Sequence, residues 1–237
     1  RTRGRGRRRD VRRPADRRDR AAGGDRGRHR DHRRGASRHA AHRAGVKHLI
    51  KLSQFAADEN SPVRFLRYHA RVENKIKELG FNYTFLRPNL YMQGLIAFKD
   101  YIKNDGNFYA SVGNAAVSAV DIRDIAAVAA KALTETGHEN KIYTITGKEA
   151  ITHDQMAEIF SRVLGREIRF IDVAPDQMEV AVRAAGFPEW QVGGLIEDYA
   201  HYARGEAAAA YNTVHDVTNV DPIGFEQFVN DYKELFS

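Results

Sequence analysis

From residue 45 onward, hydrophobic and polar positions follow the periods of strands and helices in turn. Residues 46–52 (VKHLIKL) are predicted to form a short buried strand, and residues 82–87 (NYTFLR) a second one that ends at Pro88. Residues 63–79 between them show helical spacing, and Gly80 should stop that helix. The helix stripe consists of Phe65, Leu66, His69, Val72, Ile76 and Leu79. Strand, helix and strand in this order predict a βαβ unit with parallel strands.

The next hundred residues continue this alternation. We expect a helix over residues 91–103, a turn at 104–107 and a strand at 117–120. Asp121 should cap a helix over residues 122–134, with Asp124 at its third position, so both are interpreted as capping groups rather than catalysts. That helix is rich in alanine and should lie close to a sheet. Residues 141–146 (KIYTIT) are predicted to be a third core strand.

After Gly147 the pattern is typical of a smaller α+β lobe. Thr152 and Gln155 form a capping box for a helix through Leu164, and residues 167–173 alternate like a strand. Further helices are expected from Pro175 to a stop at Gly186, over 189–204 and over 225–236. The last of these places Phe225, Phe228, Val229, Tyr232 and Leu235 on one face.

The first 45 residues differ in composition from the rest. They hold 18 Arg and 5 Asp with no Lys or Glu, a net charge of +13, whereas the whole chain carries +7 and the remainder therefore −6. Val11 is their only large aliphatic residue, so they cannot bury a core and are predicted to be disordered. Three interpretations are open: a functional basic arm, an ordinary disordered extension, or out-of-frame translation of GC-rich coding sequence. The abrupt change to a body with 10 Lys and 10 Arg favours the third.

Composition also excludes several classes of site. An acidic body gives no reason to expect nucleic acid as a partner. The chain has no Cys, which removes disulfides and thiolates and fits a reducing cytoplasm. No run reaches the ~18 apolar residues of a membrane span, so no membrane partner is expected. The histidines show no ligand spacing, so we predict no metal site, and the lack of a G-x-S-x-G motif counts against a hydrolase.

Four phrases, in this order and spacing, resemble the NmrA-like atypical short-chain dehydrogenase/reductase family. They are AGVKHLIKLS (44–53), ENKIKELGFNYTFLRPNLYMQ (73–93), VDIRDIAAVAAKAL (120–133) and KIYTITGKEAITHDQMAEI (141–159). The resemblance implies an NAD(P)H-dependent oxidoreductase, with NADP or NAD as cofactor, that transfers hydride to a quinone-like or azo substrate without flavin. The alternative is a nicotinamide-sensing regulatory protein of the same fold without catalysis.

The sequence also departs from this family. Members open with a strand and a G-x-x-G-x-x-G turn that holds the pyrophosphate at a helix N-terminus. Here the glycines of AAGGDRG (21–27) follow no strand, and the family's first four strands have no counterpart. We therefore expect a truncated or frameshifted, unstable and inactive form.

The fold class expected is α/β, a partial Rossmann-like doubly wound parallel sheet with a smaller C-terminal α+β lobe. Residues 1–44 would be a disordered Arg-rich segment, 45–147 the C-terminal half of an NAD(P)-binding Rossmann-like domain, and 148–237 a substrate-binding lobe. The sequence does not set the oligomeric state.

Site residues are expected beyond the carboxyl ends of the strands, where ligands bind in doubly wound folds. The resemblance places Ser53, Gln54 and Phe55 after one strand, and Pro88, Asn89, Leu90 and Tyr91 after the next, along the nicotinamide and the substrate. Ser53 is predicted to be catalytic as well as cofactor-binding. For the first three, a loop start with a satisfied hydroxyl remains the alternative, and Pro88 is also a strand stop.

His69 is the second catalytic candidate. Many relatives carry a Tyr-x-x-x-Lys pair in this helix, but Tyr68 is followed four residues later by Val72, so that pair is absent. Several relatives place a Lys eleven residues before the helix-ending Gly, and that position here is His69. A histidine there could donate a proton to the reduced substrate or hydrogen-bond the nicotinamide ribose. The alternative is a helix histidine with a backbone or solvent partner.

A set of aromatic residues in the second half has two interpretations. They could line the pocket of a flat aromatic small-molecule substrate, or they could be lobe core. The set comprises Trp190, Tyr199, His201, Tyr202 and Tyr211.

Overall fold

The computed structural model describes residues 40, 41 and 43–237. The predicted disorder of the Arg-rich segment and the AAGGDRG stretch lie outside these residues. From Gly45 to Ser237 the chain forms one compact unit, to which the description below refers.

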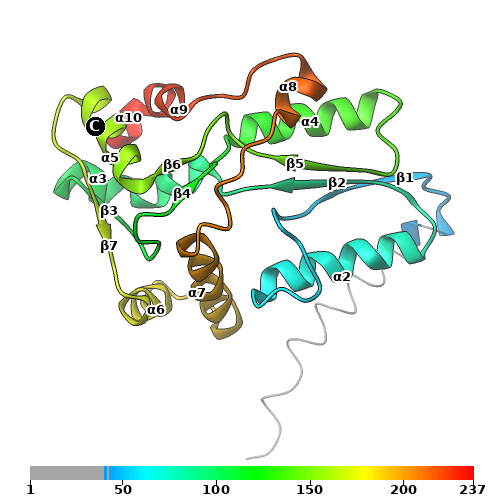
Figure 1. Ribbon diagram of the computed structural model, residues 1–237, viewed down its shortest axis with the longest axis horizontal. Coiled ribbons are helices and arrows are strands. Elements are labelled where there is room, and N and C mark those ends of the chain that lie inside the picture. Colours follow the sequence, from blue (N-terminus) through cyan, green and yellow to red (C-terminus); the bar gives the residue numbers. More distant parts are fainter. Residues whose placement is uncertain (1–39, 42) are drawn as a thin grey trace, which may run out of the picture. The chain divides into compact units, whose positions relative to one another are not determined.

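The predicted βαβ unit is present, on the right-hand side of Figure 1. Strand β1 (His48–Leu52) runs parallel to β2 (Asn82–Pro88), and helix α2 (Arg64–Glu78) connects them. Gly80 follows α2 with a φ of +73°, a left-handed conformation that favours glycine. Strand β5 (Lys141–Ile145) pairs in parallel with β2, which gives the sheet order β1-β2-β5. The α/β class and the parallel sheet are therefore confirmed.

Helix α4 (Ile122–Thr134) covers this sheet with the bounds that the sequence predicts. Asp121 caps it by accepting a hydrogen bond from the backbone N–H of Arg123. Its apolar face meets the sheet in a buried cluster, as its alanine-rich composition indicates. The cluster consists of Leu86, Val120, Ile125, Val128, Ile145 and Val214.

A second core is built from two chain regions. The first contributes the 3-10 helix η1 (Met92–Phe98), α3 (Lys99–Asp105), β3 (Asn107–Ala110) and β4 (Ala116–Val117). The second contributes β6 (Ile151–Thr152), α5 (His153–Leu164), β7 (Arg169–Asp172), α9 (Phe225–Asp231) and α10 (Lys233–Phe236). Strand β3 pairs in parallel with β7, and β4 antiparallel with β6. The rings of Phe108, Phe160, Phe228 and Phe236 are fully buried where these elements meet. The boundary at residue 147 stays a prediction.

Local details differ from the predicted pattern. The helix expected over 91–103 begins as the 3-10 helix η1, and strand β3 begins at Asn107, the last residue of the predicted turn. The helix expected over 225–236 breaks at Tyr232. This break turns Phe236 into the core, whereas Leu235 is 41% exposed. The capping box of Thr152 and Gln155 is confirmed.

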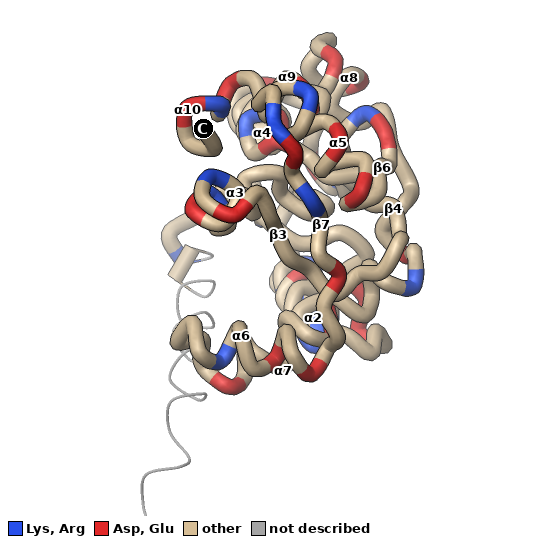
Figure 2. Tube along the Cα trace, turned by 90° about the vertical axis from the view of Figure 1, so that its left-hand side faces the viewer, with Lys and Arg blue, Asp and Glu red and all other residues tan. Residues whose placement is uncertain are grey.

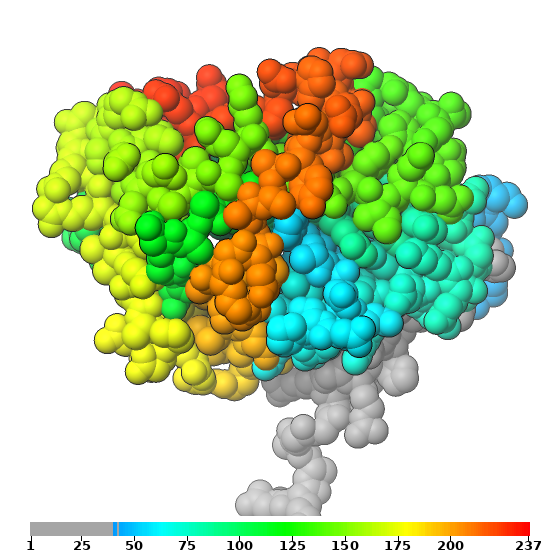
Figure 3. Space-filling model, in the orientation of Figure 1, coloured from blue at the N-terminus to red at the C-terminus, as the bar shows by residue number. Residues whose placement is uncertain are grey.

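Helix α7 (Glu189–Ala203) lies between α6 (Pro175–Ala184) and α2 (Figures 1 and 2). The guanidinium of Arg64 binds Glu197 at 2.6 Å, and an added Cβ at Gly194 would lie only 2.2 Å from the Phe65 ring. The segment from α7 to α8 (Thr213–Thr218) then crosses the ends of the strands (Figure 1) and runs over the surface as the orange band of Figure 3. The Ser118 hydroxyl donates a hydrogen bond to the Ala209 carbonyl of this segment. These contacts fix α7 beside the carboxyl end of β1.

Candidate functional site

A cleft of about 290 Å³ opens where β1 and β2 end. It brings together most residues that the sequence predicts for the site, although they come from three separate segments. Its lining consists of Leu52, Ser53, Gln54, His69, Pro88, Asn89, Leu90, Tyr91, Asp198 and Tyr202. Phe55 is not among them, because its ring is 8% exposed and belongs to the second hydrophobic core.

Ser53 connects the end of β1 to a buried ion pair. Its hydroxyl donates to Oε1 of Glu73, a residue of α2 that is 1% exposed. Arg87 of β2 holds the same carboxylate with two bonds, from Nε to Oε1 at 3.0 Å and from Nη2 to Oε2 at 2.5 Å. The Ser53 hydrogen is thus engaged by Glu73, and its oxygen remains available as an acceptor.

His69 lies on α2 within reach of Lys51 of β1. The Lys51 Nζ is 2.8 Å from Nδ1 of His69. An ammonium group only donates hydrogen bonds, so Nδ1 is the acceptor and Nε2 carries the imidazole hydrogen. The arrangement sets His69 as a hydrogen-bond donor through Nε2 at the wall of the cleft.

Asp198 of α7 forms the opposite wall, and sequence reasoning missed it. Its carboxylate accepts two bonds from the Gln54 side-chain amide, at 3.1 and 3.2 Å, and one from the Tyr202 hydroxyl at 3.3 Å. Burial raises the pKa of Asp198 to about 6. The signal was its spacing of four from Tyr202 on a predicted helix, which places both side chains on one face.

Asn89 is held by the crossing segment rather than free to turn into the cleft. The residue is 4% exposed, and its Nδ2 donates to the Ser118 hydroxyl at 2.8 Å and to the Ala207 carbonyl at 2.9 Å. Its Oδ1 accepts from the backbone N–H of Leu90. These bonds shape the chain that leads to Tyr91, whose pKa is raised by burial.

Comparison with known proteins decides the family. A model described as the NmrA-like family matches residues 38–223. The chain belongs to the NmrA-like family. It is 34% identical over 197 residues to the NAD(P)H azoreductase of Xenophilus azovorans, which covers 83% of this chain and 69% of that protein. It is 29% identical over 150 residues to quinone oxidoreductase 2 of Escherichia coli, covering 63% and 52%.

Solved structures agree with this assignment to the NmrA-like fold. The NADPH-dependent quinone oxidoreductase of Escherichia coli, complexed with NADPH, aligns with a TM-score of 0.77 and 23% identity, over 91% of this chain and 74% of that one. Triphenylmethane reductase from Citrobacter sp., complexed with NADP(H), gives 0.72 and 26% over 84% and 69%. The predicted resemblance to NAD(P)-dependent quinone and azo reductases, and the Rossmann-like fold, are confirmed.

The aromatic set in the second half of this NmrA-like chain divides between roles. Tyr202 lines the cleft, and burial raises its pKa well above the usual value. Trp190 meets the Phe65 ring edge-on at 6.1 Å between centroids. His201 binds Glu206 at 2.6 Å, and Tyr211 is 47% exposed. Tyr202 is thus the member of this set that lines the cleft.

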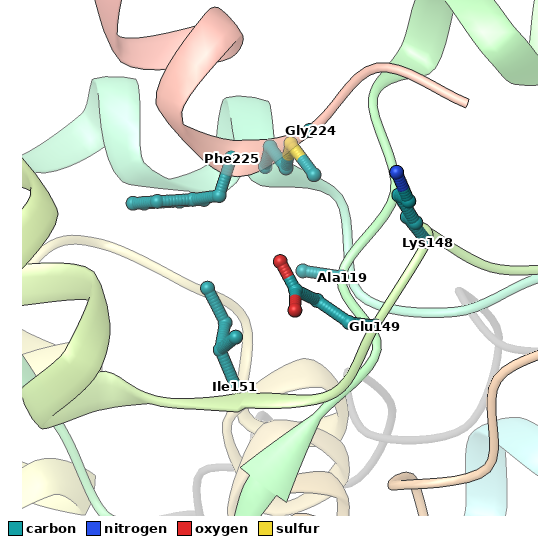
Figure 4. Close-up of a pocket in the computed structure, with 7 residues that line it drawn as sticks. Ala119, Lys148, Glu149, Ile151, Gly224 and Phe225 are labelled. Carbon is teal, nitrogen blue, oxygen red and sulfur yellow. The ribbon is translucent and has the colours of Figure 1, made fainter. Parts of the chain in front are cut away.

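A smaller hollow lies in the second core, between the segments that contain Ala119, Glu149 and Phe225 (Figure 4). The carboxylate of Glu149 points towards it, beside Ala119 and Phe225. Its volume of about 10 Å³ holds about one water molecule, too little for an aromatic ring. Within residues 40, 41 and 43–237, no group of three His, Asp or Glu side chains is placed to hold a metal ion, and no helix is long and apolar enough to cross a membrane.

Proposed function

We propose that the cleft binds the nicotinamide end of NADPH or NADH together with a quinone-like or azo substrate, and that the chain acts as a reductase. The observation that carries the proposal is the cleft itself. It lies at the carboxyl ends of adjacent parallel strands and gathers Ser53, Gln54, His69 and Tyr91. The names of the relatives at 34% and 29% identity support the same activity.

The cleft suits a flat heteroaromatic ring with a polar substituent. Its volume of about 290 Å³ is near the lower end of small-molecule sites, ~300–1,000 Å³. Leu52, Pro88 and Leu90 supply apolar walls, while Gln54 and His69 supply polar atoms at the same opening. When bound, the reduced nicotinamide supplies the hydride.

The chain's own part in this reaction is to position the reactants and deliver one proton. Reduction of an azo or quinone group by hydride also consumes a proton, and we assign its delivery to a group of the protein. His69 gives it from Nε2 as Nδ1 takes a proton from the Lys51 ammonium at 2.8 Å, so the imidazole stays neutral throughout and Lys51 is left as the uncharged amine. Ser53 acts as an acceptor beside the ring, since Glu73 holds its hydrogen.

The test is NADPH oxidation by the chain in the presence of an azo dye or a benzoquinone. We expect loss of NADPH absorbance that requires both chain and acceptor. NADPH should also raise the melting temperature, because a ligand that binds the folded state stabilises it. Binding of NADPH without turnover of either acceptor would contradict the reductase and favour the nicotinamide-sensing alternative or the inactive form expected from the sequence.

A further inference from the structure

Asp198 is the one carboxylate among the described residues that line the cleft, and the charged neighbour that favours its ionised form, His201, lies outside that lining. Among the described lining residues, the titratable side chains are Asp198, His69, Tyr91 and Tyr202, and none of those lining residues is Lys or Arg. The nearby guanidinium of Arg64 is engaged by Glu197, the neighbour of Asp198 on α7. A substrate in the cleft therefore meets one negative charge on its α7 side.

The bonds of Asp198 do not require a charge. Its partners are the neutral Gln54 amide and the neutral Tyr202 hydroxyl, and an amide oxygen in place of the carboxylate could accept from both. Burial of this carboxylate outweighs the charge of His201 and costs stability, as its raised pKa reflects. A residue type that lowers stability at a ligand-lining position is typical of a functional site.

We propose that Asp198 is a specificity-determining residue. It favours aromatic substrates whose hydroxyl or amino groups donate hydrogen bonds, and it excludes substrates that carry a sulfonate or a carboxylate. This inference rests on the proposed reductase function and names the substrate class for the same cleft. A carboxylate accepts strong hydrogen bonds from N–H and O–H groups. The same carboxylate repels an anionic substituent, because like charges brought together in a binding site disfavour the complex.

The inference can be tested with aminoazobenzene and its singly sulfonated counterpart, which differ only in the anionic group. Equilibrium binding of each dye to the full chain is measured at neutral pH by quenching of protein fluorescence. We expect the parent chain to bind the uncharged dye at least ~10-fold more tightly. Asp198→Asn should bring the affinity ratio close to one, whereas Asp198→Glu keeps the charge and should keep most of the preference.

Asp105→Asn is the matched control. Asp105 is exposed at the end of α3 and does not line the cleft, so its replacement changes the net charge of the chain equally. It should leave the ratio unchanged. Equal affinities for the two dyes in the parent chain, or a ratio that Asp198→Asn does not alter, would overturn the assignment of Asp198.

Turnover of the same two dyes with NADPH separates this inference from the function on which it rests. If no variant reduces either dye but the binding ratio responds to Asp198→Asn as expected, Asp198 selects ligands and the reductase proposal fails. If both dyes are reduced and Asp198→Asn does not change the ratio of their kcat/KM values, the proposed reductase function is supported and the selective role of Asp198 is wrong.

Discussion

The ammonium nitrogen of Lys51 lies 2.8 Å from Nδ1 of His69. This contact joins the carboxyl end of strand β1 to helix α2 at the edge of the cleft. The contact fixes which imidazole nitrogen accepts and which donates. It makes the pair a unit whose two members can be tested separately and together.

His69→Gln should lower kcat at least ~10-fold, because glutamine keeps a donor of similar size but cannot titrate. The melting temperature and the affinity for NADPH should change little. These three quantities are measured on the same preparation. A falling melting temperature with unchanged kcat would make His69 a packing residue and remove the catalytic assignment.

Lys51→Met should lower kcat in the same direction, since Nδ1 loses the donor that fixes the imidazole and resupplies its proton. Lys51→Arg retains a donor and should recover part of the rate. The double variant with His69→Gln should be no slower than His69→Gln alone, because residues that act as one unit are not additive. Additive losses in this cycle would mean that Lys51 acts independently of His69.

Ser53→Ala separates the two roles predicted for this serine. Removing the hydroxyl takes one donor from the buried Glu73, so the free energy of unfolding should fall by ~1–3 kcal/mol. Denaturant titration measures this loss, and kcat should fall less than in His69→Gln. Strong loss of kcat at full stability would instead make Ser53 a catalytic group.

Asp198→Asn should stabilise the fold at neutral pH. The folded pKa of Asp198, about 6, lies above the ordinary aspartate value of 3.8, so its ionisation costs stability as the pH rises through this window and the full cost persists above it. The titratable side chains near it are Tyr202, Tyr199 and His201 on its own helix, with His69 and Tyr91 across the cleft. We expect a gain of ~1–3 kcal/mol at neutral pH that disappears below pH ~4, measured by denaturant titration at both pH values. An equal gain at both would refute the charge as its cause.

His153 should make the second core sensitive to acid. Its imidazole is 5% exposed, lies 5.0 Å from the Phe170 ring between centroids, and burial lowers its pKa from 6.5 to about 4. Between these values the unfolded chain binds a proton that the folded chain does not, so stability is full above pH 6.5 and falls by ~3 kcal/mol towards pH 4. His153→Phe should remove this part of the pH dependence of unfolding. His215→Gln, at an exposed histidine, should not.

The predicted elements with strong local signals were the ones found. The cap at Asp121, the capping box at Thr152 and the stop at Gly80 each depend on neighbours in sequence, so they could be recognised without the fold. Strand β3 could not, because its four residues are paired by β7, about sixty residues later. The rule that ligands bind beyond strand ends led to Ser53. His69 was predicted from the family resemblance, by its place eleven residues before Gly80. Asp198 and Glu73 are placed by helix packing against distant segments, which periodicity alone does not reveal.

Gly194 helps to set the width of the cleft. A glycine there lets the backbone of α7 approach the Phe65 ring of α2, where a Cβ would lie 2.2 Å from the ring. The spacing of α7, which carries Asp198, from α2, which carries His69, therefore depends on the packing of the α7 backbone against the Phe65 ring. A larger side chain at position 194 would therefore push α7 away from α2. The cleft between the two helices would widen and admit thicker aromatic molecules.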